Sequence, residues 1–405
     1  MLNQRLERLG EYAFKRLEQL LAGVTPATNE PPLKMSVGEP QHQPPALLAE
    51  TLARNAHLWN RYPPVAGTPE WRQAVAEWLG RRYRLPAELI DPDKHLLPAA
   101  GTREALFMVS LLCLEGAQRD PAPAVLMPNP YYQVYSGGGI IAGGEPVFLN
   151  ATPQTGFLPD LDALEPALLA RAGLLFLCSP ANPQGAIASL DYWQRALGLA
   201  RQYGFTLVAD ECYSEIYGDV PPPGALEAAA ATGSLDNLLV FNSLSKRSSC
   251  PGLRAGLIAG DARHIAMFTR LRSYGGAGVP LPTIAAATAL YRDEAHVEEN
   301  RRLYRAKFDV AARLFGTRHG FYRPGGGFFL WLDVGDGEQA ARTIWREAGV
   351  VTLPGGYLAR PDQTGFNPGA AFIRIALVHD LDTTVAGLTR IARALDQHVA
   401  AAAAE

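Results

Sequence analysis

SLSKRSSCPGLRAG, residues 243–256, places a lysine between serines directly after an apolar run. Arg254 follows Lys246 by eight residues. The hydroxyls of Ser243 and Ser245 and the Arg254 guanidinium could together bind a phosphate. The Lys246 amine could form a Schiff base with a carbonyl cofactor. The alternative interpretation is an ordinary surface loop in which the lysine is solvated.

Around this segment, from residue 46 to residue 290, short apolar runs alternate with helical stretches. Such alternation predicts an α/β domain over residues 46–290, with a mostly parallel sheet flanked by helices. In sheets of this kind, ligands bind at the carboxyl ends of the strands. The predicted strands are residues 124–128, 144–150, 173–180, 205–211, 237–246 and 255–260.

The sequence changes character after residue 290. Residues 294–316 have the spacing of a long charged amphipathic helix that leads into a second, smaller α/β domain. We assign residues 1–45 and 291–405 to this smaller domain. Near its start, apolar residues from Leu2 to Leu20 recur at steps of three and four and predict one face of a helix.

Composition excludes several classes of protein. The chain has 405 residues and a formal net charge of −3, which argues against a general nucleic-acid surface. Its four cysteines show no CxxC spacing, so neither a disulfide framework nor a metal site is indicated. The first residues lack the apolar core of a secretory signal, and Pro, Gly, Asn or Ser interrupt every long uncharged stretch. We expect a cytoplasmic protein.

Two further segments place polar groups at predicted strand ends. Asp210 ends the run FTLVAD, and a buried carboxylate there requires a cation such as a protonated pyridine nitrogen. Tyr213 could then reach a phenolic oxygen on the same ring. Asn182, held before a proline, could donate to that oxygen. The alternatives are a helix-capping Asp, a core Tyr and a plain Asn-Pro turn.

Three more positions suit the same kind of ligand. Gly101, Thr102 and Arg103 open a predicted helix, whose free N–H groups attract phosphate, although ordinary capping explains them equally well. Tyr132 could stack on a planar cofactor or belong to the core. Arg374, inside the apolar run AFIRIAL, requires an anion such as a substrate carboxylate or a structural acid. Each of these motifs alone could occur by chance, but chance does not readily account for all of them in one chain.

Together these motifs resemble the class I/II, fold-type I aminotransferases that use pyridoxal 5′-phosphate. The similarity runs from SVGEP at residues 36–40 to AFIRIAL at residues 371–377. SLSKR–PGLR, EAHVEENRRLYRAKF, LPGGYLAR and RIALVHD look more narrowly like N-succinyldiaminopimelate aminotransferases of the lysine pathway. Two departures are the sequence Asn182-Pro183-Gln184-Gly185 in place of Asn-Pro-Thr-Gly, and Tyr132 where many relatives carry another aromatic.

The resemblance implies a seven-stranded type of sheet and a role for each matching residue. Lys246 looks like the Schiff-base lysine, and Asp210 looks like the partner of the pyridinium nitrogen. The remaining implied roles are Tyr213 and Asn182 at the phenolic oxygen; Thr102, Ser243, Ser245 and Arg254 with the Gly101–Arg103 amides at the phosphate; Tyr132 stacked on the ring; Tyr62 at a neighbouring subunit's phosphate; and Arg374 at the substrate α-carboxylate with Gly38 nearby.

The resemblance also implies a reaction and an assembly. Glutamate would be the amino donor and N-succinyl-2-amino-6-oxopimelate the acceptor, in a homodimer with shared sites and with no metal, nucleic acid or membrane partner. A second cation in the pocket would bind the distal carboxylate, with Arg103, Arg16 and Lys34 as candidates. The alternatives are an aspartate, alanine or aromatic aminotransferase, a β-lyase on the same cofactor, or a catalytically idle regulator.

Overall fold

A computed structural model describes residues 2–115 and 120–402. Its central feature is a seven-stranded sheet in the order β2-β8-β7-β6-β5-β3-β4, in which only β8 runs against the other six strands. The predicted mostly parallel α/β sheet is therefore confirmed. The strands are β2 (Leu96–Ala99), β3 (Ala124–Asn129), β4 (Glu145–Asn150), β5 (Ala172–Cys178), β6 (Thr206–Asp210), β7 (Leu238–Ser243) and β8 (Gly256–Gly260).

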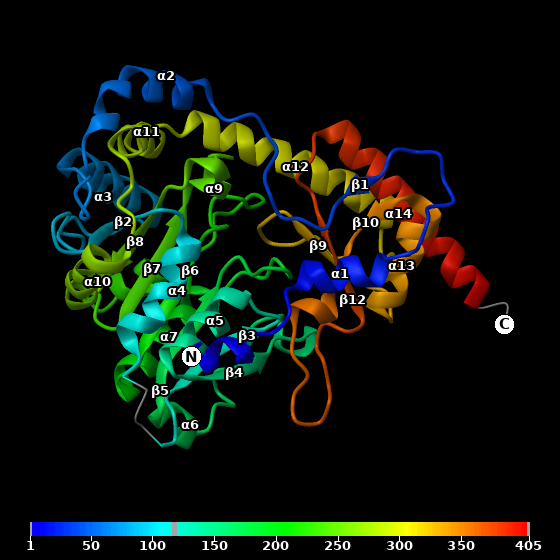
Figure 1. Ribbon diagram of the computed structural model, residues 1–405, viewed down its shortest axis with the longest axis horizontal. Helices are drawn as coiled ribbons and strands as arrows, with labels where there is room; N and C mark the ends of the chain where they lie inside the picture. The colour runs from blue at the N-terminus through cyan, green and yellow to red at the C-terminus, as the bar shows by residue number, and fades with distance from the viewer. Residues whose placement is uncertain (1, 116–119, 403–405) are drawn as a thin grey trace.

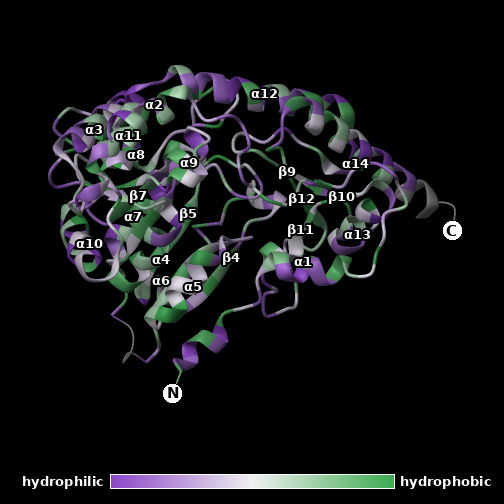
Figure 2. Cartoon of the chain, turned by 45° about the horizontal axis from the view of Figure 1, so that its top comes forward, coloured by the Kyte–Doolittle hydropathy of each residue, from purple (hydrophilic) through white to green (hydrophobic). Residues whose placement is uncertain are grey.

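Helices cover both faces of this sheet because its strands are apolar on both sides (Figures 1 and 2). Side chains alternate across β6, so Leu207 packs in one core cluster and Val208 in the other. On the first face lie α3 (Pro69–Tyr83), α7 (Leu190–Tyr203), α8 (Ala225–Ala230) and α11 (Leu281–Arg292). On the second lie α4 (Thr102–Cys113), α5 (Gln133–Ala142) and α10 (Ala262–Gly275).

A smaller unit with its own apolar core lies beside the large sheet. It contains an antiparallel sheet in the order β11-β12-β9 and the parallel pair β1-β10. Its strands are β1 (Leu33–Lys34), β9 (Phe329–Asp333), β10 (Val350–Val351), β11 (Leu353–Pro354) and β12 (Phe372–Ala376). Its helices are α1 (Ala13–Leu21), α12 (Ala295–Phe315), α13 (Gly337–Ala348) and α14 (Leu381–Ala402). Of the predicted domains, residues 1, 116–119 and 403–405 lie outside the described residues.

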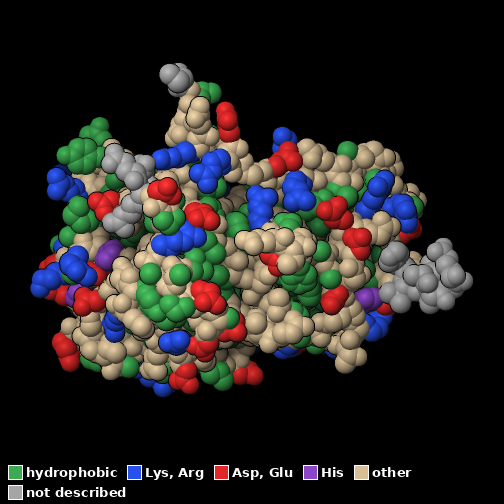
Figure 3. All heavy atoms as spheres, turned by 90° about the horizontal axis from the view of Figure 1, so that it is seen from below, with side chains coloured by type: hydrophobic (Ala, Val, Ile, Leu, Met, Phe, Trp, Pro, Cys, Tyr) green, Lys and Arg blue, Asp and Glu red, His purple; other side chains and the backbone are tan. Residues whose placement is uncertain are grey.

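The remaining elements are short and lie in the segments between those already named. They are η1 (Gln4–Arg8), α2 (Ala46–Arg54), η2 (Ala56–Asn60), η3 (Pro153–Thr155), α6 (Pro166–Ala170), α9 (Leu244–Arg247), η4 (Pro251–Leu253), η5 (Arg318–Gly320) and η6 (Gly355–Leu358). The described helices contain none that is long and apolar enough to cross a membrane. On the face shown in Figure 3, acidic and basic side chains are interspersed and no single basic patch dominates.

The prediction of one helical face over the first 20 residues is wrong. The helix is interrupted by an extended stretch from Leu9 to Tyr12, between η1 and α1. Gly10 favours the break because glycine is a poor helix former. Tertiary contacts fix it, since Arg5 donates to the Ile141 carbonyl on α5, while α1 contacts α13 in the smaller unit. The stretch therefore crosses from one unit to the other.

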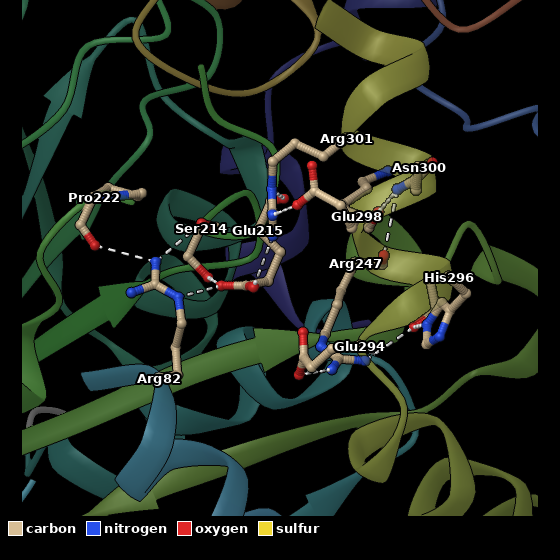
Figure 4. A network of polar contacts seen from close by, with 12 residues as sticks. Arg82, Ser214, Glu215, Pro222, Arg247, Glu294, His296, Glu298, Asn300 and Arg301 are labelled. Atoms are coloured by element: carbon tan, nitrogen blue, oxygen red, sulfur yellow. Dashed lines mark hydrogen bonds and ion pairs between the residues drawn. The ribbon is translucent and has the colours of Figure 1, made fainter. Parts of the chain in front are cut away.

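Helix α12 also crosses between the units, along the top of the view in Figure 1. Its first half is tied to the large unit by a buried ionic network around Glu215 (Figure 4). Glu215 lies 2.6 Å from Arg82 Nε on α3 and 3.6 Å from Arg301 Nη2 on α12. All three side chains are less than one-tenth exposed. One carboxylate thus joins two buried guanidinium groups from different elements.

We expect Glu215→Ala to lower the free energy of unfolding by about 3–5 kcal/mol, because it leaves two buried guanidinium groups without their shared carboxylate. Denaturant unfolding measures the change. The matched control is Asp162→Ala, which breaks the exposed Arg195–Asp162 pair and should have a much smaller effect. Equal effects of the two substitutions would contradict the role given to this network.

Candidate active site

One cavity of about 1380 Å³ opens where the carboxyl ends of β5, β6 and β7 meet the smaller unit. The expected site residues come together there from both units and from the N-terminal crossing. Those that line it are Gly38, Thr102, Arg103, Tyr132, Asn182, Asp210, Tyr213, Ser243, Ser245, Lys246, Arg254 and Arg374. Gly101 directly precedes Thr102, whereas Tyr62 is fully exposed and lies outside the cavity.

Lys246 occupies the short helix α9, which follows β7 without a connecting loop. Its Nζ donates to the Gly38 carbonyl at 2.9 Å. Burial, followed by the nearby charges of Arg374 and Arg103, lowers the pKa of the Lys246 amine to about 8. The interpretation of this lysine as a solvated loop residue is therefore wrong. Roughly one-tenth of its amine is neutral, and thus nucleophilic, at pH 7, which is far more than for an ordinary lysine.

Asp210 ends β6 with its carboxylate buried in the cavity wall. Tyr135 OH donates to Oδ2 at 2.6 Å, and the Cys212 amide donates to Oδ1 at 3.2 Å. Burial raises the pKa of Asp210, and these hydrogen bonds oppose that change. Each carboxylate oxygen keeps a free lone pair, so a protonated ring nitrogen has acceptor capacity here. Tyr135 was not identified from the sequence, where nothing distinguishes it from other core tyrosines.

Arg374 faces the same cavity from β12 in the smaller unit. Its guanidinium donates to Asn182 Oδ1 at 3.1 Å and to the Ser36 carbonyl at 2.8 Å. Its buried Nε has no hydrogen-bond partner among the described residues. Burial lowers the pKa of Arg374 to about 10. The structural salt bridge considered for this arginine is absent from the described residues, and an external anion would satisfy the guanidinium.

Asn182 and Tyr213 lie next to each other, as expected for partners of one ligand oxygen. Asn182 Nδ2 donates to the Tyr213 hydroxyl at 3.5 Å. Burial raises the pKa of the Tyr213 hydroxyl well above its usual value, so the group stays a neutral donor. Both side chains line the cavity close to Lys246, whose Nζ is 5.9 Å from the Tyr213 ring centroid.

A group of donors at the start of α4 and beside α9 suits a phosphate. Gly101 has φ +79°, and a Cβ there would lie 1.9 Å from Nη2 of Arg254. Glycine therefore lets the Arg254 guanidinium reach over the helix start, where the first amide groups are free. Ser243 Oγ donates to Ser245 Oγ at 3.0 Å, which gathers both hydroxyls at the same place. Thr102 Oγ1 lies 3.1 Å from Cys212 Sγ.

Two arginines that line the cavity each donate a hydrogen bond from Nε to a tyrosine hydroxyl. Arg103 Nε donates to the Tyr132 hydroxyl at 2.7 Å, and Arg360 Nε donates to the Tyr131 hydroxyl at 3.0 Å. Neither guanidinium forms an ion pair with a carboxylate in the described part of the chain. Arg360 was not identified from the sequence. The motif LPGGYLAR contains it, but only the fold brings it to Tyr131.

Comparisons with known proteins all point to one family. A model of the family Aminotransferase class I and II matches residues 30–391. The LL-diaminopimelate aminotransferase of Desulforudis audaxviator is 32% identical over 96% of each chain, and that of Moorella thermoacetica is 31% identical over 97% of this chain and 98% of its own.

Solved structures give the same result. An aminotransferase from Neisseria meningitidis superposes with a TM-score of 0.92 at 40% identity, covering 97% of this chain and 99% of that one. The aminotransferase AspB of Helicobacter pylori superposes with a TM-score of 0.88 at 34% identity, covering 96% and 99% of the two chains.

The lowered pKa of Lys246 has a consequence that can be measured without any ligand. Reductive labelling of amines by formaldehyde requires the neutral amine, so labelling of Lys246 should be half-maximal near pH 8. The exposed Lys94 serves as the internal control and should require a higher pH, because its hydrogen bond and ion pair with Asp91 raise the pKa of its amine. Peptide mass spectrometry reads both sites in one sample. Identical pH profiles for the two lysines would contradict the assignment.

Proposed function

Since the chain belongs to the aminotransferase class I and II family, we propose that it moves an amino group between glutamate and N-succinyl-2-amino-6-oxopimelate. Membership of this family shows that the protein is an aminotransferase that depends on pyridoxal 5′-phosphate. The observation that carries the proposal is the buried Arg374 guanidinium. It lies in the same cavity as a lysine with a pKa of about 8 and has no carboxylate partner among the described residues.

The residues present fit the cofactor. Buried Asp210 lacks a cation at hydrogen-bond distance in the described structure, and a protonated pyridine nitrogen would supply one. Tyr213 and Asn182 would hold the ring oxygen, and Tyr132 would stack on the ring. Donors for the phosphate would be Thr102, Ser243, Ser245, Arg254 and the amides of Gly101–Arg103. When bound, the pyridine ring accepts the electron pair left by the substrate Cα–H bond.

Three side chains of the protein would then have separate roles in the reaction. Asp210 would keep the proton on the ring nitrogen, because a carboxylate next to it favours the charged form. Lys246 Nζ would remove the proton from the substrate Cα as a general base, for which a pKa near the working pH is suitable. Arg374 would bind the α-carboxylate with its planar donors and so fix the Cα–H bond toward Lys246.

The substrate class follows from the outer part of the cavity. Arg103 and Arg360 keep their Nη groups unpaired with acids in the described structure, which suits a distal carboxylate or a succinyl group. Of the three cations considered from the sequence, Arg103 is the best supported. Arg16 lies over the Tyr357 ring and near Glu338, and Lys34 does not line the cavity.

A second candidate substrate comes from the relatives. Several of them carry the name LL-diaminopimelate aminotransferase, so the unsuccinylated diaminopimelate is the alternative amino compound. Both candidates carry an α-amino acid group and a distant carboxylate. Transamination of aspartate, alanine or an aromatic amino acid, and β-elimination, are the further alternatives.

The assembly is a further part of the proposal. Tyr62 is fully exposed and does not line the cavity of its own chain, as expected of a residue that completes a neighbour's phosphate site. A homodimer with twofold symmetry follows if it does so, because each site would then need both chains. We place the reaction in the cytoplasm, where the four free cysteines would stay reduced.

We expect Lys246→Ala to abolish amino transfer from glutamate and to remove the absorbance of the lysine-bound cofactor, while circular dichroism still shows a folded protein.

Asp210→Asn should lower kcat by ~10²-fold or more, because the ring nitrogen loses its carboxylate. Lys94→Ala, on the surface, is the control and should match the wild type. A near-native rate in either site variant would refute the corresponding role.

A panel of oxo acids tests the substrate class. Arg360→Met should raise KM for the succinylated acceptor by about 10- to 100-fold, the value of a charge-assisted hydrogen bond, and leave KM for pyruvate nearly unchanged. Lys34→Met is the control outside the cavity. Equal losses with both acceptors would contradict a distal anion site at this arginine. Turnover only with the unsuccinylated compound would favour the second candidate.

A further inference from the structure

A continuous chain of hydrogen bonds joins the strand that carries Arg374 to the helix that carries Lys246. It starts at the Leu377 carbonyl, which accepts from Lys307 Nζ at 3.1 Å. The same Nζ lies 2.5 Å from His42 Nε2, and His42 Nδ1 lies 2.7 Å from Asn300 Oδ1. Asn300 Nδ2 then donates to the carbonyl of Lys246 at 3.0 Å and to that of Arg247 at 3.3 Å.

The direction of every proton in this chain is determined by its ends. Backbone carbonyls only accept, so the Asn300 amide nitrogen must face Lys246 and Arg247, and its oxygen must face His42. His42 Nδ1 therefore carries the hydrogen. Its Nε2 lone pair is left to accept from Lys307. When Lys307 is an ammonium, which only donates, His42 is neutral and in the Nδ1–H tautomer.

Burial supports the neutral form of His42. Lys307 is buried, and burial lowers its pKa to about 7. Burial, and then the adjacent Lys307 amine, lower the pKa of His42. The carboxylates facing this pair are Glu299 on α12 and Asp380 before α14, and the Tyr304 ring packs against both groups. Neither carboxylate is hydrogen-bonded to the pair in the described structure.

Helix α9 needs such support because it has only four residues. Its C-terminal carbonyls would otherwise be open, and Asn300 supplies the donors that satisfy two of them. Glu294 and His296 hold the neighbouring side chains of Arg247 and Ser248, at 2.6 and 2.8 Å (Figure 4). Among the described residues, Asn300 is the one whose side chain donates to the carbonyl of Lys246 itself.

We propose that Asn300, His42 and Lys307 form a positioning relay that holds the Lys246 amine in place relative to the Arg374 strand. The relay presupposes the roles proposed above for Lys246 and Arg374. Its residues touch neither substrate nor cofactor, and they act through the backbone of α9 at one end and of Leu377 at the other. A small displacement of Lys246 is enough to slow proton transfer by ~10²-fold.

The first test uses formaldehyde labelling of Lys246 in protein from which the cofactor has been removed, so that the amine is free, and it needs no activity. Asn300→Ala removes the cap on α9, so the Lys246 amine becomes more hydrated and its half-labelling pH should rise by about one unit. His42→Phe keeps a ring against Tyr304 but breaks the relay, and it should shift the labelling in the same direction. Arg313→Met, at an exposed position of the same helix, is the control and should leave the pH profile unchanged.

The second test uses the holoenzyme with glutamate and its oxo-acid acceptor. Asn300→Ala and His42→Phe should lower kcat by about tenfold or more and change KM less, because the relay positions Lys246 and does not bind substrate. The tautomer is read directly by nitrogen-15 NMR of histidine-labelled wild type, where comparison with His42→Phe assigns the signal. We expect the Nδ1–H form, and this measurement on the wild type does not depend on the folding of Asn300→Ala.

Unshifted Lys246 labelling in both relay variants would overturn the proposal, as would an Nε2–H tautomer of His42. If the wild type labels near pH 8 and the variants shift but no oxo acid is turned over, the proposed function fails and the relay stands. If turnover is found and labelling does not respond to the variants, the function stands and the relay fails.

Discussion

Two buried charges of opposite sign, Asp210 and Arg374, set the conditions for the rest of the site. Neither forms an ion pair with another charged side chain in the described structure. Burial therefore raises the pKa of Asp210 and lowers that of Arg374. An unpaired buried ion is unfavourable by several kcal/mol, so the chain alone does not favour this arrangement. A ligand that brings a cation to Asp210 and an anion to Arg374 removes both penalties. Ligand binding and the stability of the folded chain are therefore linked.

The large sheet brings its part of the site together by register. Asp210 on β6 lies opposite Phe241 on the adjacent parallel strand β7, so Ser243 and then Lys246 follow just beyond the same edge. Strands that run in the same direction end on the same side, and the chain then turns into helices whose first amides are free. The topology of the sheet thus places Lys246 and the serines proposed to bind the phosphate. Arg374 comes from a different sheet and needs the second unit to be placed against the first.

The sequence alone predicted those site residues that lie at or just after the end of a buried strand. Lys246, Asp210 and Asn182 each follow an apolar run, and the structure brings all three to one cavity. An arginine inside an apolar strand was equally informative, because burial of a charge requires a reason. These signals are local, and a single sequence displays them.

Other parts of the site leave no local signal. Tyr135 contacts Asp210 across 75 residues, and Arg360 contacts Tyr131 across 229. Strand β2 was not predicted, because its four residues are too few to show a period. The break between η1 and α1 was missed for a different reason. The apolar spacing was real, but contacts with two separate units outweigh the helical preference of a few residues.

The division of the site between two units explains the arrangement of α12. Lys246 is on a helix of four residues, which has no stability of its own, and so its orientation depends on what packs against it. Glu294, which caps α12, and His296 and Asn300 in its first half contact that helix or the residue after it, and Arg301 contacts the buried Glu215. The second half packs Phe308 and Phe315 into the core of the smaller unit. One continuous helix therefore carries both the support of the lysine and the core against which the Arg374 strand is folded. A tilt of α12 would therefore move both. The stiffness of an α-helix holds the distance between the Lys246 amine and the Arg374 guanidinium, which a flexible linker would leave free to vary.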